Sequence, residues 1–176
     1  AEGFLNASQE LNSFPQGMDT LVYVDFEMVP FDKPVVMKNI LYDFDSATLR
    51  PESKEGLDQL VCLMQEHPEI EVELAAHTDR MGSDEYNRDL SAQRAQAVVD
   101  YLQGQGIERE RLTAVGYGKS RPAIVTRQVA ATHEFLDEGV TLSEEFIQGL
   151  TTEQQEVADQ VNRRTEFTVM GKEKRP

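Results

Sequence analysis

The chain has 176 residues, of which 32 are Asp or Glu and 17 are Lys or Arg, and its formal net charge is -15. This length fits one domain of ordinary size with an appendage. The acidic balance argues against a nucleic acid partner or an anionic membrane surface, because both recruit faces rich in Lys and Arg. No apolar run approaches membrane-spanning length. The single cysteine, Cys62, excludes an intramolecular disulfide and a zinc cluster built on several cysteines.

Residues 1–34 are predicted to be a segment separate from the main domain. Within it, apolar residues recur with the period of a strand at Val22, Val24, Phe26 and Met28. One strand without a partner is not stable alone. This strand must therefore pack on the following domain, pair with another chain, or end a neighbouring domain.

Residues 35–171 carry the pattern of a single α/β domain. Alternation of apolar and polar residues predicts strands over 40–45, 70–76, 112–117 and 165–169. Helical spacing predicts a first helix that starts near Pro51 and stops before Pro68. A second, longer helix is expected between the N-cap Ser83 and Gly104. A small mixed sheet with helices on one face, a two-layer sandwich in the order β-α-β-α-β-(α)-β, is the natural solution for these elements.

A long excursion at residues 121–161 interrupts this pattern before the last strand. A short helix is expected over 143–148, and Thr152 with Gln155 suggests a capping box at the start of another. Loops this long without structure are unusual, so we expect the excursion to be ordered. Its large apolar side chains need burial: Phe135, Leu136, Leu142, Phe146, Ile147 and Leu150. Residues 172–176 are expected to form a flexible tail.

A set of short motifs along the main domain resembles the OmpA-like peptidoglycan-binding domain, a family that includes the periplasmic end of OmpA-type porins, the lipoprotein Pal and the stator protein MotB. The motifs run in family order over roughly residues 38–170. They are Tyr42-Asp43-Phe44-Asp45, His77-Thr78-Asp79, Tyr86-Asn87, Leu90-Ser91-Ala92-Gln93-Arg94-Ala95, Gly116-Tyr117-Gly118-Lys119 with Pro122, and Asn162-Arg163-Arg164-Thr165-Glu166-Phe167. The excursion is longer than in most members, so the resemblance implies no role for it. Residues 1–34 in turn resemble the end of the β-sandwich modules that precede such domains in some large outer-membrane-associated proteins.

The resemblance implies a domain that holds the peptide stem of peptidoglycan noncovalently and reads its diaminopimelate residue. By position, Asp79 corresponds to the carboxylate that reads the ligand and Arg94 to the guanidinium. Five further residues fall on positions that line the same groove: Phe44, Asp45, Thr78, Asn87 and Leu90. Asn162 and Arg163 match the family signature before the last strand, and we assign them a contact role as well.

Elementary chemistry is compatible with Asp79 and Arg94 as the two residues that recognise the ligand. Diaminopimelate carries an ammonium and a carboxylate on its side chain, so a site for it needs one anion and one cation at a fixed separation. Asp supplies acceptors only, and Arg supplies a fork that grips a carboxylate through two parallel hydrogen bonds. Spacing alone favours an internal ion pair between Asp79 and Arg94, or separate surface contacts, over a ligand site. The complete ordered set of motifs reverses that preference.

Other chemically capable residues receive simpler interpretations. Cys62 lies beside the apolar stripe of the first helix, and we expect it to be buried and unreactive. Three histidines, His67, His77 and His133, share no ligand spacing, so no metal site and no cofactor are expected. Asp43 and Asp45 are alternate residues that imitate a glycosidase pair, but nothing identifies a sugar cleft.

The sequence therefore predicts a peptidoglycan-binding domain without catalysis, which anchors an outer-membrane protein or complex to the cell wall. Its place would be the periplasmic face of the outer membrane of a Gram-negative bacterium. Other outer-membrane or periplasmic proteins are possible partners, whereas nucleic acid and direct membrane insertion by this chain are not expected. Two alternatives remain open: a protein-protein interaction module that kept the fold and lost the ligand, and a cell-wall hydrolase.

Overall fold

The computed structural model describes residues 33–43 and 45–170. Its core is a four-stranded sheet with the order β1-β4-β2-β3. The strands are β1 (Pro34–Val36), β2 (Glu71–His77), β3 (Leu112–Gly118) and β4 (Thr165–Met170). β2 and β3 are parallel, whereas β4 runs antiparallel to both of its neighbours. The predicted small mixed sheet is confirmed. The strand predicted over 22–28 and the tail 172–176 lie outside the described residues.

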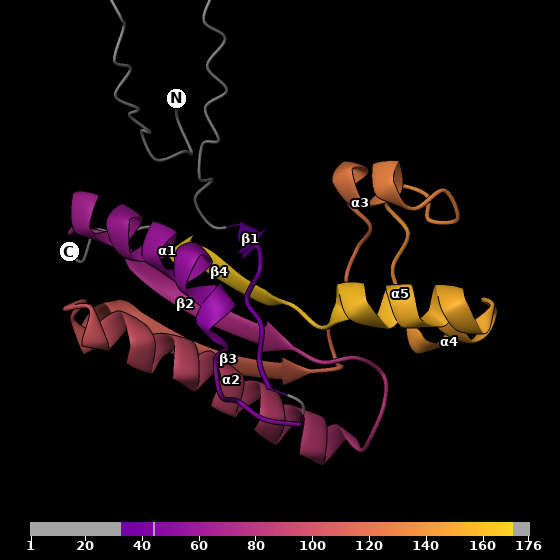
Figure 1. The fold of residues 1–176 in the computed structure, drawn as a ribbon, viewed down its shortest axis with the longest axis horizontal. Helices are drawn as coiled ribbons and strands as arrows, with labels where there is room; N and C mark the ends of the chain where they lie inside the picture. Colours follow the sequence, from indigo (N-terminus) through magenta and orange to yellow (C-terminus); the bar gives the residue numbers. More distant parts are fainter. Residues whose placement is uncertain (1–32, 44, 171–176) are drawn as a thin grey trace, which may run out of the picture.

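Two long helices, α1 (Lys54–Glu66) and α2 (Asp84–Gly104), cover one face of this sheet (Figure 1). Period-2 alternation turns Val72 and Leu74 of β2 and Val169 of β4 toward these helices, and each of the three side chains is at most 1% exposed. Each helix packs against these strands with a stripe of apolar residues at helical spacing. Those stripes consist of Leu57, Leu60, Val61 and Met64 in α1 and Val98, Val99 and Leu102 in α2.

The ends of both helices follow the expected signals. Ser83 is the N-cap of α2 and its side chain accepts a hydrogen bond from the Tyr86 amide at 3.2 Å. Pro51 opens a short 3-10 turn, η1 (Pro51–Ser53), which continues directly into α1. α1 ends before Pro68, as predicted. A second 3-10 turn, η2 (Arg109–Arg111), leads into β3.

The strand predicted over residues 40–45 is wrong. This segment contributes only an isolated bridge between Tyr42 and Leu49, while the first strand of the sheet lies earlier, at Pro34–Val36. Asn39 and Asp45 have φ values of 59° and 52°, left-handed conformations that turn the chain at both ends of this short segment. The alternation of apolar and polar residues here therefore reflects a half-buried loop and not a strand. Pro34, assigned to the preceding segment by sequence, pairs with Thr168 in the sheet.

Cys62 is exposed, which contradicts the expectation of a buried thiol. Its neighbours in sequence, Val61 and Met64, point into the core. A residue one position after Val61 is rotated by about 100° around the helix axis. That rotation carries Cys62 off the buried stripe and onto the solvent side.

The excursion folds around a second hydrophobic core, as predicted. Three helices build it: α3 (Arg127–Thr132), α4 (Glu144–Gln148) and α5 (Thr152–Asn162). Leu136, Leu142 and Ile147 are buried there, with Phe135, Phe146 and Leu150 packed against them. The capping box of α5 lies one residue earlier than expected, between Thr151 and Gln154. All three helices gather beyond the carboxyl ends of β2 and β3 (Figure 1).

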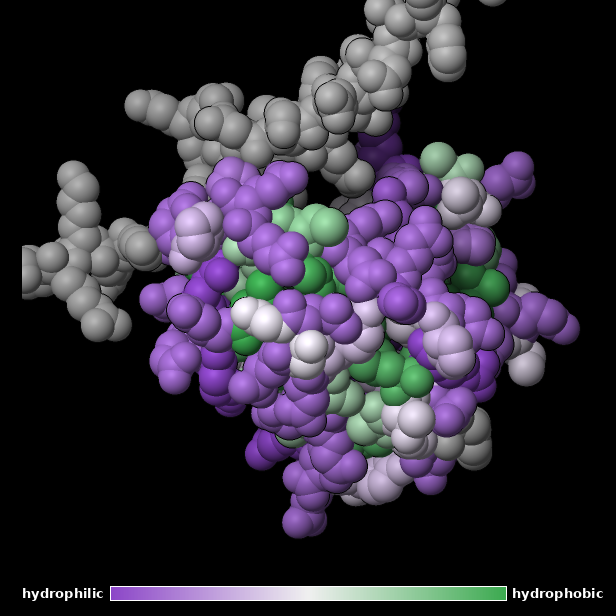
Figure 2. All heavy atoms as spheres, turned by 60° about the vertical axis from the view of Figure 1, so that its left-hand side comes forward, coloured by the Kyte–Doolittle hydropathy of each residue, from purple (hydrophilic) through white to green (hydrophobic). Residues whose placement is uncertain are grey.

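The outer surface is largely hydrophilic where Figure 2 shows it, and apolar side chains gather there only in small separate areas. The large apolar side chains of the described residues are instead concentrated in the two cores. Within residues 33–43 and 45–170, no helix has both the length and the apolar composition needed to cross a bilayer.

Candidate functional site

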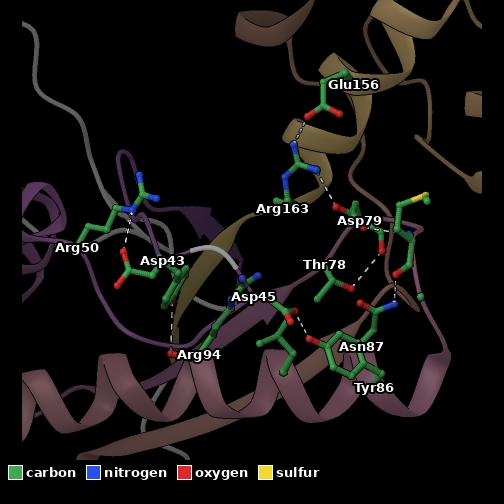
Figure 3. A pocket seen from close by; sticks show the side chains of 14 residues that line it. Asp43, Asp45, Arg50, Thr78, Asp79, Tyr86, Asn87, Arg94, Glu156 and Arg163 are labelled. Atoms are coloured by element: carbon green, nitrogen blue, oxygen red, sulfur yellow. Dashed lines mark hydrogen bonds and ion pairs between the residues drawn. The ribbon is translucent and has the colours of Figure 1, made fainter.

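A cavity of about 600 Å³ lies among the loop that follows β2, the start of α2 and the end of α5. Four pieces of chain form its walls: the loop before η1, the loop after β2, the first turns of α2, and α5 with the residue that follows it. The lining residues are Tyr42, Asp43, Asp45, Arg50, Thr78, Asp79, Met81, Gly82, Tyr86, Asn87, Leu90, Arg94, Glu156 and Arg163 (Figure 3). Seven of the nine residues predicted from sequence are among them.

Asp79 leaves the end of β2 and is held by contacts on both carboxylate oxygens. Oδ1 accepts a hydrogen bond from the Met81 amide at 2.9 Å, and Oδ2 lies 2.7 Å from Nη1 of Arg163. The side chain remains 17% exposed. Because each carboxylate oxygen can accept two hydrogen bonds, Asp79 retains capacity for a further donor that enters the cavity.

Arg94 reaches the cavity from the inward side of α2. Its Nε donates to the Ser46 carbonyl at 3.0 Å, and its guanidinium carbon lies 4.9 Å from the centre of the Tyr42 ring. Burial lowers the pKa of Arg94, and the charges of Tyr42 and Asp79 oppose that shift. Among the described residues, Nε is the only nitrogen of Arg94 with a hydrogen-bond acceptor. The two terminal nitrogens therefore keep their donors for a ligand.

Asp79 and Arg94 are not joined by an ion pair in the described part of the chain. The guanidinium on Asp79 is that of Arg163, which also contacts Glu156 Oε1 at 2.6 Å. Burial disfavours the charge of Arg163, but the two carboxylates outweigh it and raise its pKa. The internal pair weighed from the sequence thus exists with a different arginine, and Arg94 faces the same cavity from another wall (Figure 3).

The smaller predicted site residues line the cavity between these poles. Thr78 and Asn87 are buried, and the Asn87 side chain donates to the Met81 carbonyl at 2.6 Å, which fastens the loop after β2 to α2. Leu90 supplies apolar lining. Asp45 accepts a hydrogen bond from the Tyr86 hydroxyl across the mouth of the cavity.

One predicted residue is placed differently. Asn162 is buried outside the cavity, where its side chain accepts from the Ala123 amide at 2.8 Å and donates to the Leu142 carbonyl at 3.0 Å. These bonds tie the end of α5 to the earlier part of the excursion. Phe44 lies outside the described residues.

Several lining residues were not predicted. Tyr42 belongs to the motif Tyr42-Asp43-Phe44-Asp45, so its place two residues before Phe44 points to the same groove. Asp43 and Arg50 form an ion pair with Nε and Oδ1 3.2 Å apart, which folding of the loop 42–50 creates. No sequence pattern points to Glu156, because only the packing of α5 against the loop after β2 brings this residue to the cavity.

The fold is shared with solved structures of other proteins. The peptidoglycan-associated lipoprotein from Burkholderia pseudomallei matches with a TM-score of 0.53 and 24% identity, over 74% of this chain and 87% of that one. A MotB-like protein from Desulfovibrio vulgaris matches with a TM-score of 0.51 and 24% identity, over 78% of this chain and 73% of that one. At this identity the likeness establishes the fold alone.

Sequence comparison adds the family. Outer membrane protein A of Shimwellia blattae is 44% identical over 86 residues, 48% of this chain and 36% of that protein. Outer membrane porin F of Pseudomonas fluorescens is 42% identical over 84 residues, 48% of this chain and 26% of the porin. The chain thus spans about a third or less of the length of these curated relatives. The sequence model of the OmpA family matches residues 41–133, more than half of the chain. This chain belongs to the OmpA family.

Proposed function

We propose that this protein binds the peptide stem of peptidoglycan noncovalently, through its diaminopimelate residue, and so anchors an outer-membrane protein or complex to the cell wall. The observation that carries the proposal is the cavity in which Asp79 and Arg94 each keep hydrogen-bonding capacity unused. Membership of the OmpA family and the names of the relatives support the envelope setting. The periplasmic face of a Gram-negative outer membrane is the location that fits.

The charges of the cavity suit a zwitterionic group. The diaminopimelate ammonium would donate to Asp79, and its carboxylate would take the fork offered by the terminal nitrogens of Arg94. Asp43, Asp45, Asp79 and Glu156 face Arg50, Arg94 and Arg163 among the lining residues, so opposite charges nearly balance there. Recognition is then local, which reconciles a net charge of -15 with an anionic polymer.

Binding without catalysis is the function that this set of residues supports. Most charged groups of the cavity already contact one another, as in the pairs Arg50–Asp43 and Arg163–Asp79. No serine, cysteine or histidine is among the described lining residues, so the cavity lacks the usual nucleophile and base pair of a hydrolase. In the described ranges, no cluster of three or more His, Cys, Asp and Glu side chains is placed to hold a metal ion. A hydrolase would instead release soluble fragments from purified peptidoglycan, which is a direct assay for that alternative.

Isothermal titration with a stem peptide tests the proposal. Asp79→Ala and Arg94→Ala should each weaken binding on the order of tenfold to a hundredfold, because each removes one charged hydrogen-bonding partner. Arg94→Lys should also bind poorly, since an ammonium does not form the bidentate fork. Asp89→Ala and Arg88→Ala, exposed positions of α2 outside the cavity lining, are the matched controls.

The ligand can be varied in the same experiment. A stem peptide with lysine in place of diaminopimelate keeps the ammonium and lacks the carboxylate, so wild type should bind it weakly and Arg94→Ala should lose little more. Retention of wild-type affinity in both folded alanine variants would refute the cavity as the ligand site. Wild type that binds envelope proteins but no stem peptide would favour the interaction module.

A further inference from the structure

Helix α5 touches both the core of the excursion and the candidate site. Ala158 is fully buried in the second core, and Asn162 is bonded to Ala123 and Leu142 within the excursion. Toward the site, α5 presents Gln155 and Asp159, which are four residues apart and so lie on one face of the helix. The side chain that they receive is Arg80, the residue next to Asp79.

Arg80 is held by two separate contacts with this face. Its Nε lies 3.2 Å from Oδ2 of Asp159, and its Nη2 donates to Oε1 of Gln155 at 2.7 Å. Gln155 in turn donates to the Leu150 carbonyl at 3.0 Å, which continues the connection into the excursion. The side chains of Arg80 and Asp159 are only 20% and 6% exposed. Arg80 therefore forms a shielded ion pair with Asp159 and a hydrogen bond with Gln155.

An ion pair in this position is a poor source of stability. Removing two charges from water costs free energy that their attraction often fails to recover. Burial accordingly raises the pKa of Asp159 and the charge of Asp79 adds to that shift, whereas Arg80 and Arg163 oppose it. Together with the hydrogen bond to Gln155, such a pair can instead fix the relative position of the segments that it joins.

The segment that Arg80 fixes is the loop that carries Asp79. Other contacts hold the backbone of this loop from the side of α2 and β3: Asn87 donates to the Met81 carbonyl, and Lys119 donates to the Gly82 carbonyl at 3.1 Å. Arg80 is the side chain that fastens the loop to α5 at a point outside the cavity lining. With Arg80 fixed, the adjacent Asp79 is left directed toward the cavity, where Met81 and Arg163 contact it.

We propose that Arg80 is a positioning residue, through which the excursion sets the orientation of Asp79 and thereby the affinity of the site. Its effect on the stem peptide rests on the proposed function, whereas its effect on Asp79 does not. The excursion then belongs to the binding site as a supporting wall, although its own core lies apart from the ligand.

Three variants break this contact to different degrees. Arg80→Met removes the contacts with both Asp159 and Gln155. Asp159→Asn removes the negative charge at nearly constant side-chain shape. Arg80→Lys keeps the ion pair with Asp159 but loses the guanidinium that contacts Gln155 at the same time. Glu153→Gln is the matched control, because it removes one exposed carboxylate from α5 with no recorded partner among the described side chains. Each is measured by titration with the diaminopimelate-containing stem peptide and by the amide resonance of Met81, whose N–H donates to Asp79.

Arg80→Met and Asp159→Asn should bind the peptide about tenfold more weakly than wild type, and Arg80→Lys should recover most of that loss. In the ligand-free protein, the Met81 amide should shift and exchange faster in the first two variants. Glu153→Gln should leave both readouts unchanged. A merely structural role would lower the melting temperature without moving the Met81 signal in the folded protein.

Two results overturn the inference: wild-type affinity in folded Asp159→Asn, or an unchanged Met81 amide in that variant whatever its affinity. Asp159→Asn serves as the second variant if Arg80→Met does not fold. Should wild type itself fail to bind the peptide, the proposed function falls, and the Met81 amide of the ligand-free variants alone decides the role of Arg80.

Discussion

The two hydrophobic cores of this protein are built by different means. The first lies between a sheet and two long helices, and elements far apart in sequence, from Met37 to Val169, contribute to it. The second is assembled from short helices and connecting loops within residues 123–158, with partly buried neighbours up to Val161. Long elements bring their own hydrogen bonds and apolar stripes, whereas the excursion relies on capped turns and on few large side chains.

This difference explains where the candidate site lies. The cavity is lined mainly by segments that adjoin elements of the first core, namely the loops after β2 and before η1 and the start of α2. The second core contributes through α5, which brings Glu156 and Arg163 to the cavity and holds Arg80 outside it. Segments beside the first core thus present most of the polar groups, and α5 adds Glu156 and Arg163 to them.

The largest effect is expected where helix and sheet approach most closely. A Cβ at Gly116 would lie 2.6 Å from the Cα of Ala92, so Gly116→Ala must push α2 away from β3. We expect a loss of about 4 kcal/mol or more in the free energy of unfolding, seen in urea titration. Gly104→Ala, whose added Cβ meets nothing within 4 Å, is the control and should be neutral or slightly stabilising. Equal effects at the two positions would contradict this packing.

Matched truncations compare the two cores directly. Leu74 and Leu142 are both 0% exposed, one in each core. Leu74→Ala should cost about 3 kcal/mol of global stability. Leu142→Ala should act first on the excursion, because a small unit opens locally before the whole domain unfolds. Amide hydrogen exchange would show faster exchange confined to residues 123–150 in that variant, and uniform loss of protection would mean that the two cores unfold as one.

Acid should weaken the sheet at Glu166 of β4. Burial works against the charge of this carboxylate, but His77 and Arg164 outweigh it and lower its pKa from 4.5 to about 2. The stabilisation is therefore complete above pH 4.5 and is lost as the pH falls toward 2. This loss is on the order of 2–3 kcal/mol, and Glu166→Gln should remove that part of the pH dependence in thermal melts. Asp159 has a raised pKa and should act in the opposite direction, favouring folding as the pH falls.

The smallest effect is expected at Cys62. Its exposed position on the outer side of α1 predicts rapid, stoichiometric labelling of the folded protein by a thiol reagent. Cys62→Ser should change the free energy of unfolding by less than about 0.5 kcal/mol. Slow labelling limited by unfolding would place the thiol inside the first core after all.

Much of the fold was predictable from residue patterns alone. Alternation in Val72, Leu74 and Ala76, and helical spacing in Leu57, Leu60, Val61 and Met64, are local signals that reflect burial on one side of each element. Capping residues such as Ser83 also act within one turn of chain, which is why the start of α2 was found. Two predictions were wrong. At residues 40–45, the alternation of apolar and polar residues belongs to a loop and not to a strand. Cys62 is next to buried residues in sequence, but it lies on the exposed side of α1.

The sequence by itself determined which residue types the site contains, because motifs such as His77-Thr78-Asp79 are contiguous and their order along the chain can be read directly. Only the tertiary structure decided how those residues are paired. Asp79 meets Arg163 across 84 positions, and Arg80 meets Asp159 through the packing of α5. Such contacts depend on the relative placement of separate elements, which no local period encodes. The partner of a charged side chain is fixed by that placement and by the shielding from water that comes with it.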